Sequence, residues 1–368
     1  MRIRLLHCGD IHLDAPFTSL SDAEGRPEQR RQELKQVISR IVELAAEEQV
    51  DLLLVCGDLY EHGYVRKSTI QFVSDQFEKI QKIPVLIIPG NHDPATADSF
   101  YYHFRWPSNV CILREEKGFY EHAGSGARVY TRLPLSDKLD RSRINILMCH
   151  GTLDMPFSTD AYQPLSSKDI EDCGFDYCAL GHFHTRMFEA GIQKRIFNAG
   201  SPEPLGFDEE GDHGVYLSMI EKAPGEESRI EAEFKVLNLR HFLNLSVQTG
   251  GCLSDEQAAI QAKLVLRDTG SSEDLYRIFL QGYITQGFKI DPLRVADLLA
   301  TEAFFIRVVD QTTPEYDLAL ISDEPGLRGL FARKMLDRAA AAGEEEKQLI
   351  MQALYYGLEA IDEGRVCI

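Results

Sequence analysis

The segment Asp51-Leu-Leu-Leu-Val-Cys-Gly-Asp58 is a run of apolar residues that ends in a glycine and a carboxylate. Two similar runs, at 3–8 and 84–89, are also followed by a glycine and polar side chains. Apolar residues at helical spacing separate the three runs, over 28–48 and 67–81. This alternation of helices with almost entirely apolar strands predicts parallel strands that are buried on both faces.

Strand-like segments dominate the next part of the chain, as far as residue 237. We expect these strands at 110–113, 127–133, 144–149, 175–180, 194–198, 214–220 and 230–237. The loop 222–228 contains Pro224 and Gly225 and joins the last two strands as a hairpin. The first part of the molecule is therefore expected to end near residue 240.

The pattern changes after residue 241 to shorter strands that alternate with helices. Ser254-x-x-Gln257 matches a capping box, and Asp291-Pro292 fits an N-cap followed by the first helical residue. These signals predict a small βαβ-type domain over 241–315. Two further helices are expected over 325–363, with a break at Ala342-Gly343.

The composition restricts the class of protein. The chain has 368 residues, a hydrophobic content of 44% and a net charge of −19, so we expect about two globular domains without broad attraction to nucleic acid or anionic membranes. It contains no run of about 18 apolar residues, and we therefore expect no membrane span. The eight cysteines form no CxxC pair, which predicts free thiols and a cytoplasmic location.

Histidine, aspartate or asparagine directly follows five of the expected strands. The five segments are Gly9-Asp10-Ile11-His12, Gly57-Asp58, Gly90-Asn91-His92-Asp93, Cys149-His150-Gly151 and Gly181-His182-Phe183-His184. Parallel strands bring their carboxyl ends to one edge of a sheet, so we expect these side chains to converge. On an extended chain, Asp10 and His12 would face the same way, as would His182 and His184.

The converging side chains are typical metal ligands. Carboxylates, an amide and imidazoles suit Mn²⁺, Fe or Zn²⁺, and the set lacks the thiolates of a structural zinc site. Their number predicts two divalent ions with Asp58 as the bridge, the ligands being Asp10, His12 and His184 for one ion and Asn91, His150 and His182 for the other. Two such ions would clamp a phosphate and generate a bound hydroxide.

A further histidine, His92, is expected beside the metals without binding them. It is adjacent to Asn91 and would point the opposite way on an extended turn, which suits a general acid. Asp93 is expected to orient the imidazole and to raise its pKa.

In this order, the five motifs resemble those of the calcineurin-like metallophosphoesterase superfamily, over roughly residues 1–240. The segments Asp10-Ile-His-Leu-Asp-Ala-Pro-Phe17 and Asn198-Ala-Gly-Ser-Pro-Glu-Pro-Leu-Gly-Phe207 resemble bacterial DNA-repair nuclease subunits of the SbcD and YhaO type, which work with an SMC-like ATPase. The resemblance implies an α/β (α+β) fold in which a two-sheet β-sandwich is flanked by helices. It also implies a catalytic domain over 1–240, a cap domain over 241–315 and a C-terminal helical segment over 325–363.

The same resemblance implies which residues take part in the chemistry. It assigns metal ligation to Asp10, His12, Asp58, Asn91, His150, His182 and His184, and the catalytic histidine to His92. The implied activity is a two-metal phosphodiesterase, most simply a DNA-repair nuclease using Mn²⁺. Its implied partners are DNA, an SMC-like ATPase and a second copy of the chain, with no membrane.

Two alternatives stay open at this point. One is a nucleotide or small-molecule phosphoesterase, and the other is a non-catalytic interaction subunit of an SMC-like ATPase, against which the intact His92-Asp93 pair argues. A protein phosphatase is disfavoured, because that group carries an Arg shortly after the Gly-Asp motif and a Glu where this chain has Asp93.

Some candidate residues lie outside the metal motifs. Archaeal and eukaryotic relatives carry a second functional histidine where this chain has Glu61, and His62 follows it, so Glu61 and His62 are candidates for substrate contact. Near the C-terminus, basic residues lie beside apolar ones at Arg328, Arg333 and Lys334. They predict either an amphipathic helix packed on its neighbour or a helix that docks a partner.

A second basic cluster lies near the start of the helix expected over 28–48. Its members are Arg26, Arg30, Arg31 and Lys35. They are candidates for contact with a nucleic-acid backbone, although Glu24, Glu28 and Glu33 interleave with them and weaken the case.

Overall fold

The computed structural model describes residues 1–20, 25–113, 118–133, 139–155, 162–190, 194–223, 225–285 and 287–363. Contacts within the chain divide it into two compact units, Met1–Leu243 and Asn244–Ile368. Each unit has its own sheets and helices and is described separately below.

The first sheet of the first unit has the strand order β12-β11-β1-β2-β3-β4. Its strands are β1 (Arg2–Cys8), β2 (Leu52–Cys56), β3 (Val85–Ile88), β4 (Val110–Ile112), β11 (Gly214–Glu221) and β12 (Arg229–Val236). The pairs β1–β2 and β2–β3 are parallel, as the sequence predicts. The pair β3–β4 is parallel as well, and β11 is antiparallel to both β1 and β12.

The second sheet of this unit has the order β5-β6-β7-β8-β10-β9. Its strands are β5 (Tyr120–Glu121), β6 (Arg128–Tyr130), β7 (Asn145–His150), β8 (Tyr177–Gly181), β9 (Met187–Ala190) and β10 (Ile196–Asn198). The four central strands are parallel, and the antiparallel edge strands β5 and β9 were not predicted. Strand β5 has only two residues, and β9, with the sequence Met-Phe-Glu-Ala, does not alternate apolar with polar side chains.

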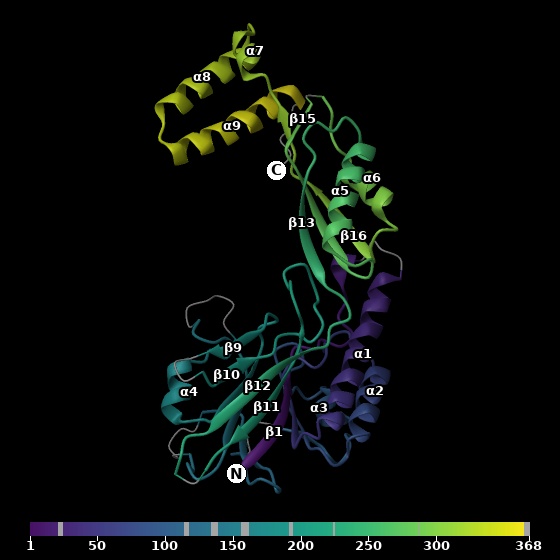
Figure 1. The fold of residues 1–368 in the computed structure, drawn as a ribbon, viewed down its shortest axis with the longest axis vertical. Helices are drawn as coiled ribbons and strands as arrows, with labels where there is room; N and C mark the ends of the chain where they lie inside the picture. Colours follow the sequence, from purple (N-terminus) through teal and green to yellow (C-terminus); the bar gives the residue numbers. More distant parts are fainter. Residues whose placement is uncertain are drawn as a thin grey trace. The chain divides into compact units, whose positions relative to one another are not determined.

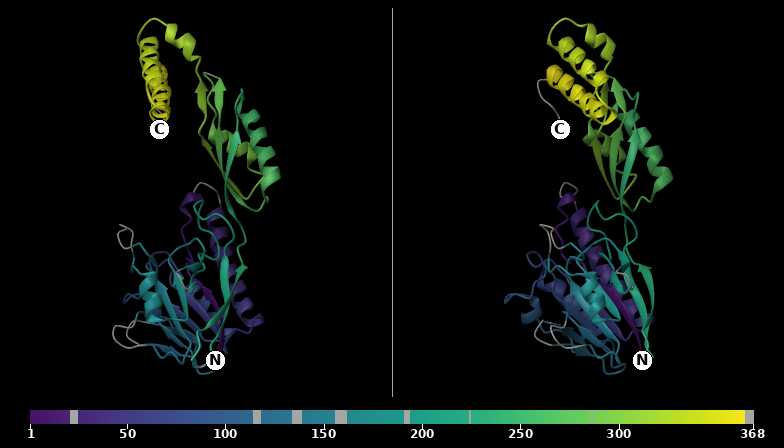
Figure 2. Two further views of the ribbon diagram at one scale, coloured as in Figure 1. Left: turned by 60° about the vertical axis from the view of Figure 1, so that its left-hand side comes forward. Right: turned by 90° about the vertical axis from the view of Figure 1, so that its left-hand side faces the viewer.

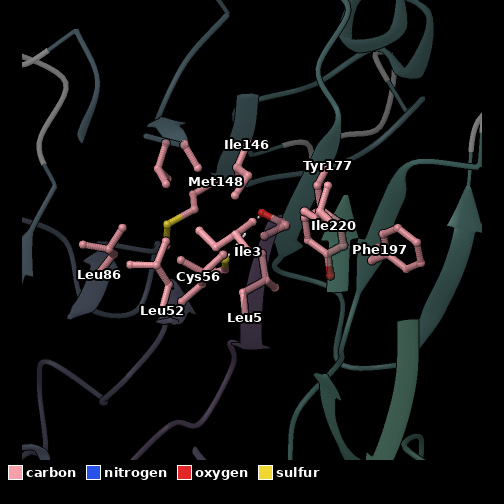
Figure 3. Close-up of a cluster of buried hydrophobic side chains, with 14 of the residues drawn as sticks. Ile3, Leu5, Leu52, Cys56, Leu86, Ile146, Met148, Tyr177, Phe197 and Ile220 are labelled. Atoms are coloured by element: carbon pink, nitrogen blue, oxygen red, sulfur yellow. Dashed lines mark hydrogen bonds between the residues drawn. The ribbon is translucent and has the colours of Figure 1, made fainter. Parts of the chain in front are cut away.

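The hydrophobic core of this unit lies between the two sheets. Alternate residues of β2 (Leu52, Leu54 and Cys56) share one buried cluster with Ile146 and Met148 of β7 (Figure 3). Since every residue of β2 is buried, its remaining side chains must also be covered on the other face. This explains why the strand is apolar throughout.

Helices cover the outer faces of both sheets. The elements concerned are η1 (Thr18–Leu20), α1 (Arg26–Glu47), α2 (Lys67–Glu78), α3 (Phe100–His103) and α4 (Ser167–Cys173). Helices α1 and α2 lie side by side next to the first sheet, and α4 lies on the side of the second (Figure 1). On α4, Ile170 packs against Leu147 and Leu180 of the second sheet. The expected α/β fold with two packed sheets flanked by helices is confirmed.

The second unit contains a three-stranded sheet of order β13-β14-β16 and a strand pair, β15–β17. Its elements are β13 (Phe242–Gln248), α5 (Asp255–Thr269), β14 (Leu275–Gln281), β15 (Tyr283–Thr285), α6 (Pro292–Leu299), β16 (Phe305–Asp310), β17 (Thr313–Glu315), α7 (Leu318–Asp323), α8 (Leu327–Ala341) and α9 (Glu344–Glu363). The side chains of Ser254 and Asp291 cap α5 and α6, as their motifs predict. Helices α8 and α9 pack side by side (Figure 2).

The C-terminal helices have a core of their own, in which Ile321 of α7 meets Ala332 of α8 and Leu354 of α9. The break between α8 and α9 falls at Ala342 and Gly343, where the sequence predicts it, whereas α7 was not predicted. None of the described helices combines the length and the apolar character needed to cross a lipid bilayer.

Candidate metal centre

Strand ends from both sheets supply the side chains of the centre. Asp10, Asp58 and Asn91 follow the parallel strands β1, β2 and β3 of the first sheet. His150 ends β7, and His182 directly follows its parallel neighbour β8 in the second sheet. The facing sheets therefore bring the carboxyl ends of five strands to one place, as expected for a site in a parallel sheet.

The backbone has a positive φ angle at four of the predicted ligands. Asp10, His12 and Asp58 have φ angles of 52°, 51° and 50°, in a left-handed region that residues other than glycine seldom adopt, and His182 has a φ angle of 104°. The amide of His12 donates to the carbonyl of Asp58 at 2.9 Å, which ties the two turns together. Contrary to the expectation from the sequence, the chain is therefore not extended at Asp10 and His12, but the two side chains do meet in one group, because turns rather than strand alternation direct them there.

Glycines beside the turns make room for the ligands. A Cβ atom on Gly57 would lie 2.2 Å from Nδ1 of His150, and one on Gly90 would lie 2.2 Å from Oδ1 of Asp58. Gly57 also has a φ angle of 82°, which favours glycine. These two glycines allow the strand ends to approach closely enough for side chains from both sheets to meet.

One group of ligand atoms consists of Asp10, His12 and His184, which lie within 4.8 Å of one another. The two Nε2 atoms of the histidines are 3.0 Å apart. Asp10 is fully buried, and both of its carboxylate oxygens accept from the amide of His182 at 3.0 Å. These are the three residues that the sequence predicts for one ion.

A second group surrounds the side-chain oxygen of Asn91. This Oδ1 atom lies 2.9 Å from Nε2 of His150 and 3.2 Å from Nδ1 of His182. Asp58 lies between the groups, with Oδ2 at 3.2 Å from Nε2 of His150 and 3.7 Å from Nε2 of His12. The structure thus brings together all seven predicted ligands, with Asp58 in the intermediate position.

The protonation pattern of the first group fits a bound cation. Nδ1 of His12 faces a carboxylate oxygen of Glu61 at 2.7 Å, and Nδ1 of His184 faces one of Glu209 at 2.8 Å. An ionised carboxylate only accepts hydrogen bonds, so each Nδ1 carries a hydrogen and Nε2 is the ring nitrogen left to bind a metal ion. The two Nε2 atoms, 3.0 Å apart beside the carboxylate of Asp10, suit a divalent metal ion.

The surrounding carboxylates also favour positive charge on the histidines. Burial alone would lower the pKa of His184, but Glu209 and the nearby aspartates raise it to about 9. Burial also lowers the pKa of His150, but Asp58 and Asp10 outweigh this effect and raise it to about 9. Burial raises the pKa of Asp58, but His150, His12 and the amide of His92 together outweigh it and hold that pKa at about 2. The carboxylates of the site therefore favour positive charge beside them.

His92 lies at the edge of the centre, with 45% of its side chain exposed. Its Nδ1 atom is 3.0 Å from a carboxylate oxygen of Glu61, and its amide donates to Asp58 at 2.7 Å. The hydrogen bond to Glu61 raises the pKa of His92. Glu61 therefore contacts both a predicted metal ligand, His12, and the predicted general acid.

Asp93 does not have the expected contact with the imidazole of His92. Its buried carboxylate instead accepts from the amides of Gly90 at 2.6 Å and Leu59 at 2.7 Å, and from the hydroxyl of Tyr101. The expectation that Asp93 orients His92 is therefore wrong: Asp93 points into the protein and fixes the loops that carry Asp58 and Asn91, while Glu61 holds the imidazole.

His62, the other candidate for substrate contact, lies near this edge. Its amide donates to the carbonyl of His92 at 3.0 Å, and its Nε2 atom is 3.2 Å from a carboxylate oxygen of Asp98. It is not part of the groups of metal-binding side chains found among the described residues.

Two of the four basic residues near the start of α1 pair with acidic side chains of this protein. Arg30 is completely buried and forms hydrogen bonds with Glu33 at 2.6 Å and Glu203 at 2.5 Å. Arg31 pairs with Glu28 at 2.8 Å. For Arg30 the expectation of backbone contact is wrong, since its guanidinium joins α1 to the loop that follows β10.

In the C-terminal helices, Arg328 links three elements, pairing with Glu324 at 2.5 Å and with Asp362 of α9 at 2.8 Å. Arg333 donates to the backbone carbonyl of Ser322, and Lys334 is exposed. The contacts of Arg328 fit the expectation of an amphipathic helix packed on its neighbours. The expectation of a docking helix stays a prediction.

Sequence reasoning missed Glu209, whose carboxylate holds His184 from the loop between β10 and β11. No motif in the sequence distinguishes Glu209 from the neighbouring Asp208 and Glu210. The burial of Glu209 sets it apart, since Asp208 and Glu210 are exposed.

The fold and the donor set together suit a phosphoesterase domain with a metal centre. Residues 3–186 match the family of calcineurin-like phosphoesterases. The matched segment is half of the chain and includes all seven predicted ligands, so the chain belongs to this family. This confirms the resemblance noted from the five motifs.

Three curated proteins are among its relatives. Uncharacterized metallophosphoesterase YhaO of Bacillus subtilis is 30% identical over 239 residues, which are 59% of this chain and 57% of that protein. A subunit of the nuclease SbcCD from Staphylococcus epidermidis is 24% identical, over 50% of this chain and 57% of that protein. DNA double-strand break repair protein Mre11 of Methanopyrus kandleri is 23% identical, over 74% of this chain and 66% of that protein. This chain thus spans between 57% and 66% of their lengths.

Proposed function

We propose that this protein is a DNA-repair nuclease subunit that hydrolyses phosphodiester bonds with the help of two divalent ions. The observation that carries the proposal is the pair of adjoining ligand groups with Asp58 between them and His92 at their edge. The similarity to a nuclease subunit and to a DNA double-strand break repair protein supports DNA as the substrate.

The residues would divide the work as follows. Asp10, His12 and His184 would hold one ion, and Asn91, His150 and His182 the other, with Asp58 between the two. Bound there, divalent ions such as Mn²⁺ would neutralise the charge of a phosphodiester and lower the pKa of an attacking water.

His92 would supply the proton for the leaving oxygen. Glu61 accepts the hydrogen of Nδ1, which leaves Nε2 of the partly exposed ring to face a substrate. Because the hydrogen bond to Glu61 raises the pKa of His92, the ring holds a proton at Nε2 in a larger fraction of molecules near neutral pH. Asp93 would support the reaction indirectly, by fixing the loop that carries Asn91 and His92.

The net charge of −19 bears on how DNA would be held. Affinity for duplex DNA comes largely from basic side chains on phosphates, so a chain this acidic has little broad electrostatic grip. We therefore include in the proposal an SMC-like ATPase partner that docks on the C-terminal helices, and a homodimer. The segment 241–315 would act as a cap, and free cysteines are consistent with a cytoplasmic location.

The decisive experiment compares His92→Ala with the wild type on labelled single- and double-stranded DNA, bis(p-nitrophenyl) phosphate and nucleotides, in Mn²⁺. We expect the variant to keep both ions and to lose about 100-fold or more of its hydrolysis, the usual contribution of a general acid. His103→Ala removes an exposed imidazole outside the centre and is the control. Loss of metal from His92→Ala would refute the role of His92. Wild-type activity on nucleotides but on no DNA would favour a nucleotide phosphoesterase.

A further inference from the structure

Glu209 is a buried carboxylate that points at a predicted metal ligand. Its Oε1 atom lies 2.8 Å from Nδ1 of His184, and its side chain is only 7% exposed. Its Oε2 atom accepts from the hydroxyl of Ser201 at 2.8 Å and from the amide of Leu205 at 3.0 Å. Burying a carboxylate is costly unless its oxygens are paired, and here three donors hold it in one orientation.

The loop that carries Glu209 is braced by a buried histidine, His213. Nδ1 of His213 lies 2.7 Å from the carbonyl oxygen of Ser201, and Nε2 lies 3.1 Å from that of Glu209. The ring of His213 therefore connects the backbone at Ser201 with the backbone at Glu209. This contact gives His213 a structural role and limits movement of the carboxylate away from His184.

Glu61 makes the equivalent contact with the other histidine of the first group. One of its oxygens is 2.7 Å from Nδ1 of His12, and the other is 3.0 Å from Nδ1 of His92. Both imidazoles of the first group thus give their Nδ1 hydrogen to a carboxylate. Such a partner fixes the ring and its tautomer and makes the free nitrogen a stronger metal ligand.

His150 of the second group has a weaker partner. Its Nδ1 atom is 2.9 Å from the carbonyl oxygen of Cys56, and the carboxylate of Asp10 is farther away, at 3.9 Å. Nδ1 of His182 faces the predicted ligand Asn91 at 3.2 Å, so this nitrogen points into the ligand group itself. For His150, a neutral oxygen therefore takes the place that a carboxylate occupies in the first group.

We infer that Glu209 is a positioning residue for His184, as Glu61 is for His12, and that the pair makes the first ligand group bind its ion more tightly than the second. This inference rests on the proposed two-metal function. It adds that the two ions bind unequally and names the side chains responsible.

The test is a titration of chelator-treated protein with Mn²⁺ by isothermal titration calorimetry, which does not depend on activity. We expect two affinity classes in the wild type. Glu209→Ala should weaken the tighter class by about 10- to 100-fold. Glu209→Gln keeps an acceptor of the same shape and should restore part of the affinity. Glu210→Ala removes the neighbouring exposed carboxylate and should leave both classes unchanged.

The outcomes separate this inference from the proposed function. Two ions of equal affinity in the wild type, or a tight class unchanged in Glu209→Ala, would overturn the inference and leave the two-metal function standing. A wild-type protein that binds no Mn²⁺ would contradict the proposed function itself. If Glu209→Ala does not fold, Glu209→Gln decides the matter, since an unchanged tight class in that variant would show that the carboxylate's charge is not needed.

Discussion

His7 on β1 allows a quantitative prediction of how stability depends on pH. The ring is fully buried, with Nε2 at 3.1 Å from the carbonyl oxygen of Leu180 and Nδ1 at 3.2 Å from the hydroxyl of Tyr177. The carbonyl only accepts, so Nε2 carries the hydrogen and Nδ1 accepts from Tyr177. Burial lowers the pKa of His7 from 6.5 to about 4, although the hydrogen bond to Leu180 acts in the opposite direction.

The sign follows from proton uptake on unfolding. The unfolded chain binds this proton near pH 6.5 and the folded chain only near pH 4, so stability is fully present above pH 6.5 and is lost as the pH falls. The difference between these pKa values corresponds to about 3 kcal/mol in all. At about pH 5 the unfolded histidine is charged and the folded one is mostly neutral, which costs about 2 kcal/mol relative to about pH 8.

The perturbation is His7→Gln, whose amide can donate to Leu180 and accept from Tyr177 without titrating. The assay is urea unfolding of chelator-treated protein at these two pH values, followed by the fluorescence of Trp106, the single tryptophan, which lies in the first unit. When the pH is lowered from about 8 to about 5, the unfolding free energy of the wild type should fall by about 2 kcal/mol more than that of the variant. His103→Gln, at an exposed ring, controls for the loss of an imidazole.

Comparing two proteins cancels the contribution of every group that titrates equally in both. The reasoning is refuted if the wild type and His7→Gln lose the same unfolding free energy between the two pH values. A variant that is less stable by the same amount at both pH values would show that His7 contributes packing alone.

Three further changes probe the centre and the core. Asp58→Asn should bind fewer than two Mn²⁺ ions, because the ligand between the groups loses its charge; metal analysis that finds two tightly bound ions would contradict that position. Arg30→Met removes the guanidinium that pairs with the buried carboxylate of Glu203, whereas Glu33 keeps Arg240 at 2.8 Å. The change should lower the unfolding free energy by about 3 to 5 kcal/mol in urea, and an unchanged value would argue against the network. Removing metal with a chelator should lower the melting temperature reported by Trp106, because ions that bind only the folded state stabilise it; an unchanged value would argue against a metal site in the first unit.

Local sequence signals predicted much of the fold. The apolar runs at β1, β2 and β3, the capping residues Ser254 and Asp291, and the break at Ala342-Gly343 depend on residues within a few positions of one another. Such signals are carried by hydrophobic period and by turn chemistry, which can be read from one segment alone. The short edge strands β5 and β9 lack a periodic pattern and were missed for that reason.

In the candidate site, too, the sequence predicted some residues and missed others. Polar residues after apolar strands identified the seven possible ligands, because parallel strands must bring their carboxyl ends together. The carboxylates that form hydrogen bonds with those histidines could not be identified from the sequence. Asp93 and Glu61 are both acidic residues near His92, and only the turn after β3 decides that Asp93 points inward and that Glu61 meets the imidazole.

The sequence by itself therefore determined the class of fold, the order of the strands that carry ligands, and the donor types that suit divalent metals. Tertiary structure alone decided which carboxylates hold which histidines, as for Glu61 with His12 and Glu209 with His184. It also decided that Arg30 is buried against Glu203, 173 positions away, instead of facing a nucleic acid. Periodicity is a local property of the chain, whereas the partner of a buried charge depends on which distant segment packs against it, since an unpaired charge is too costly to bury.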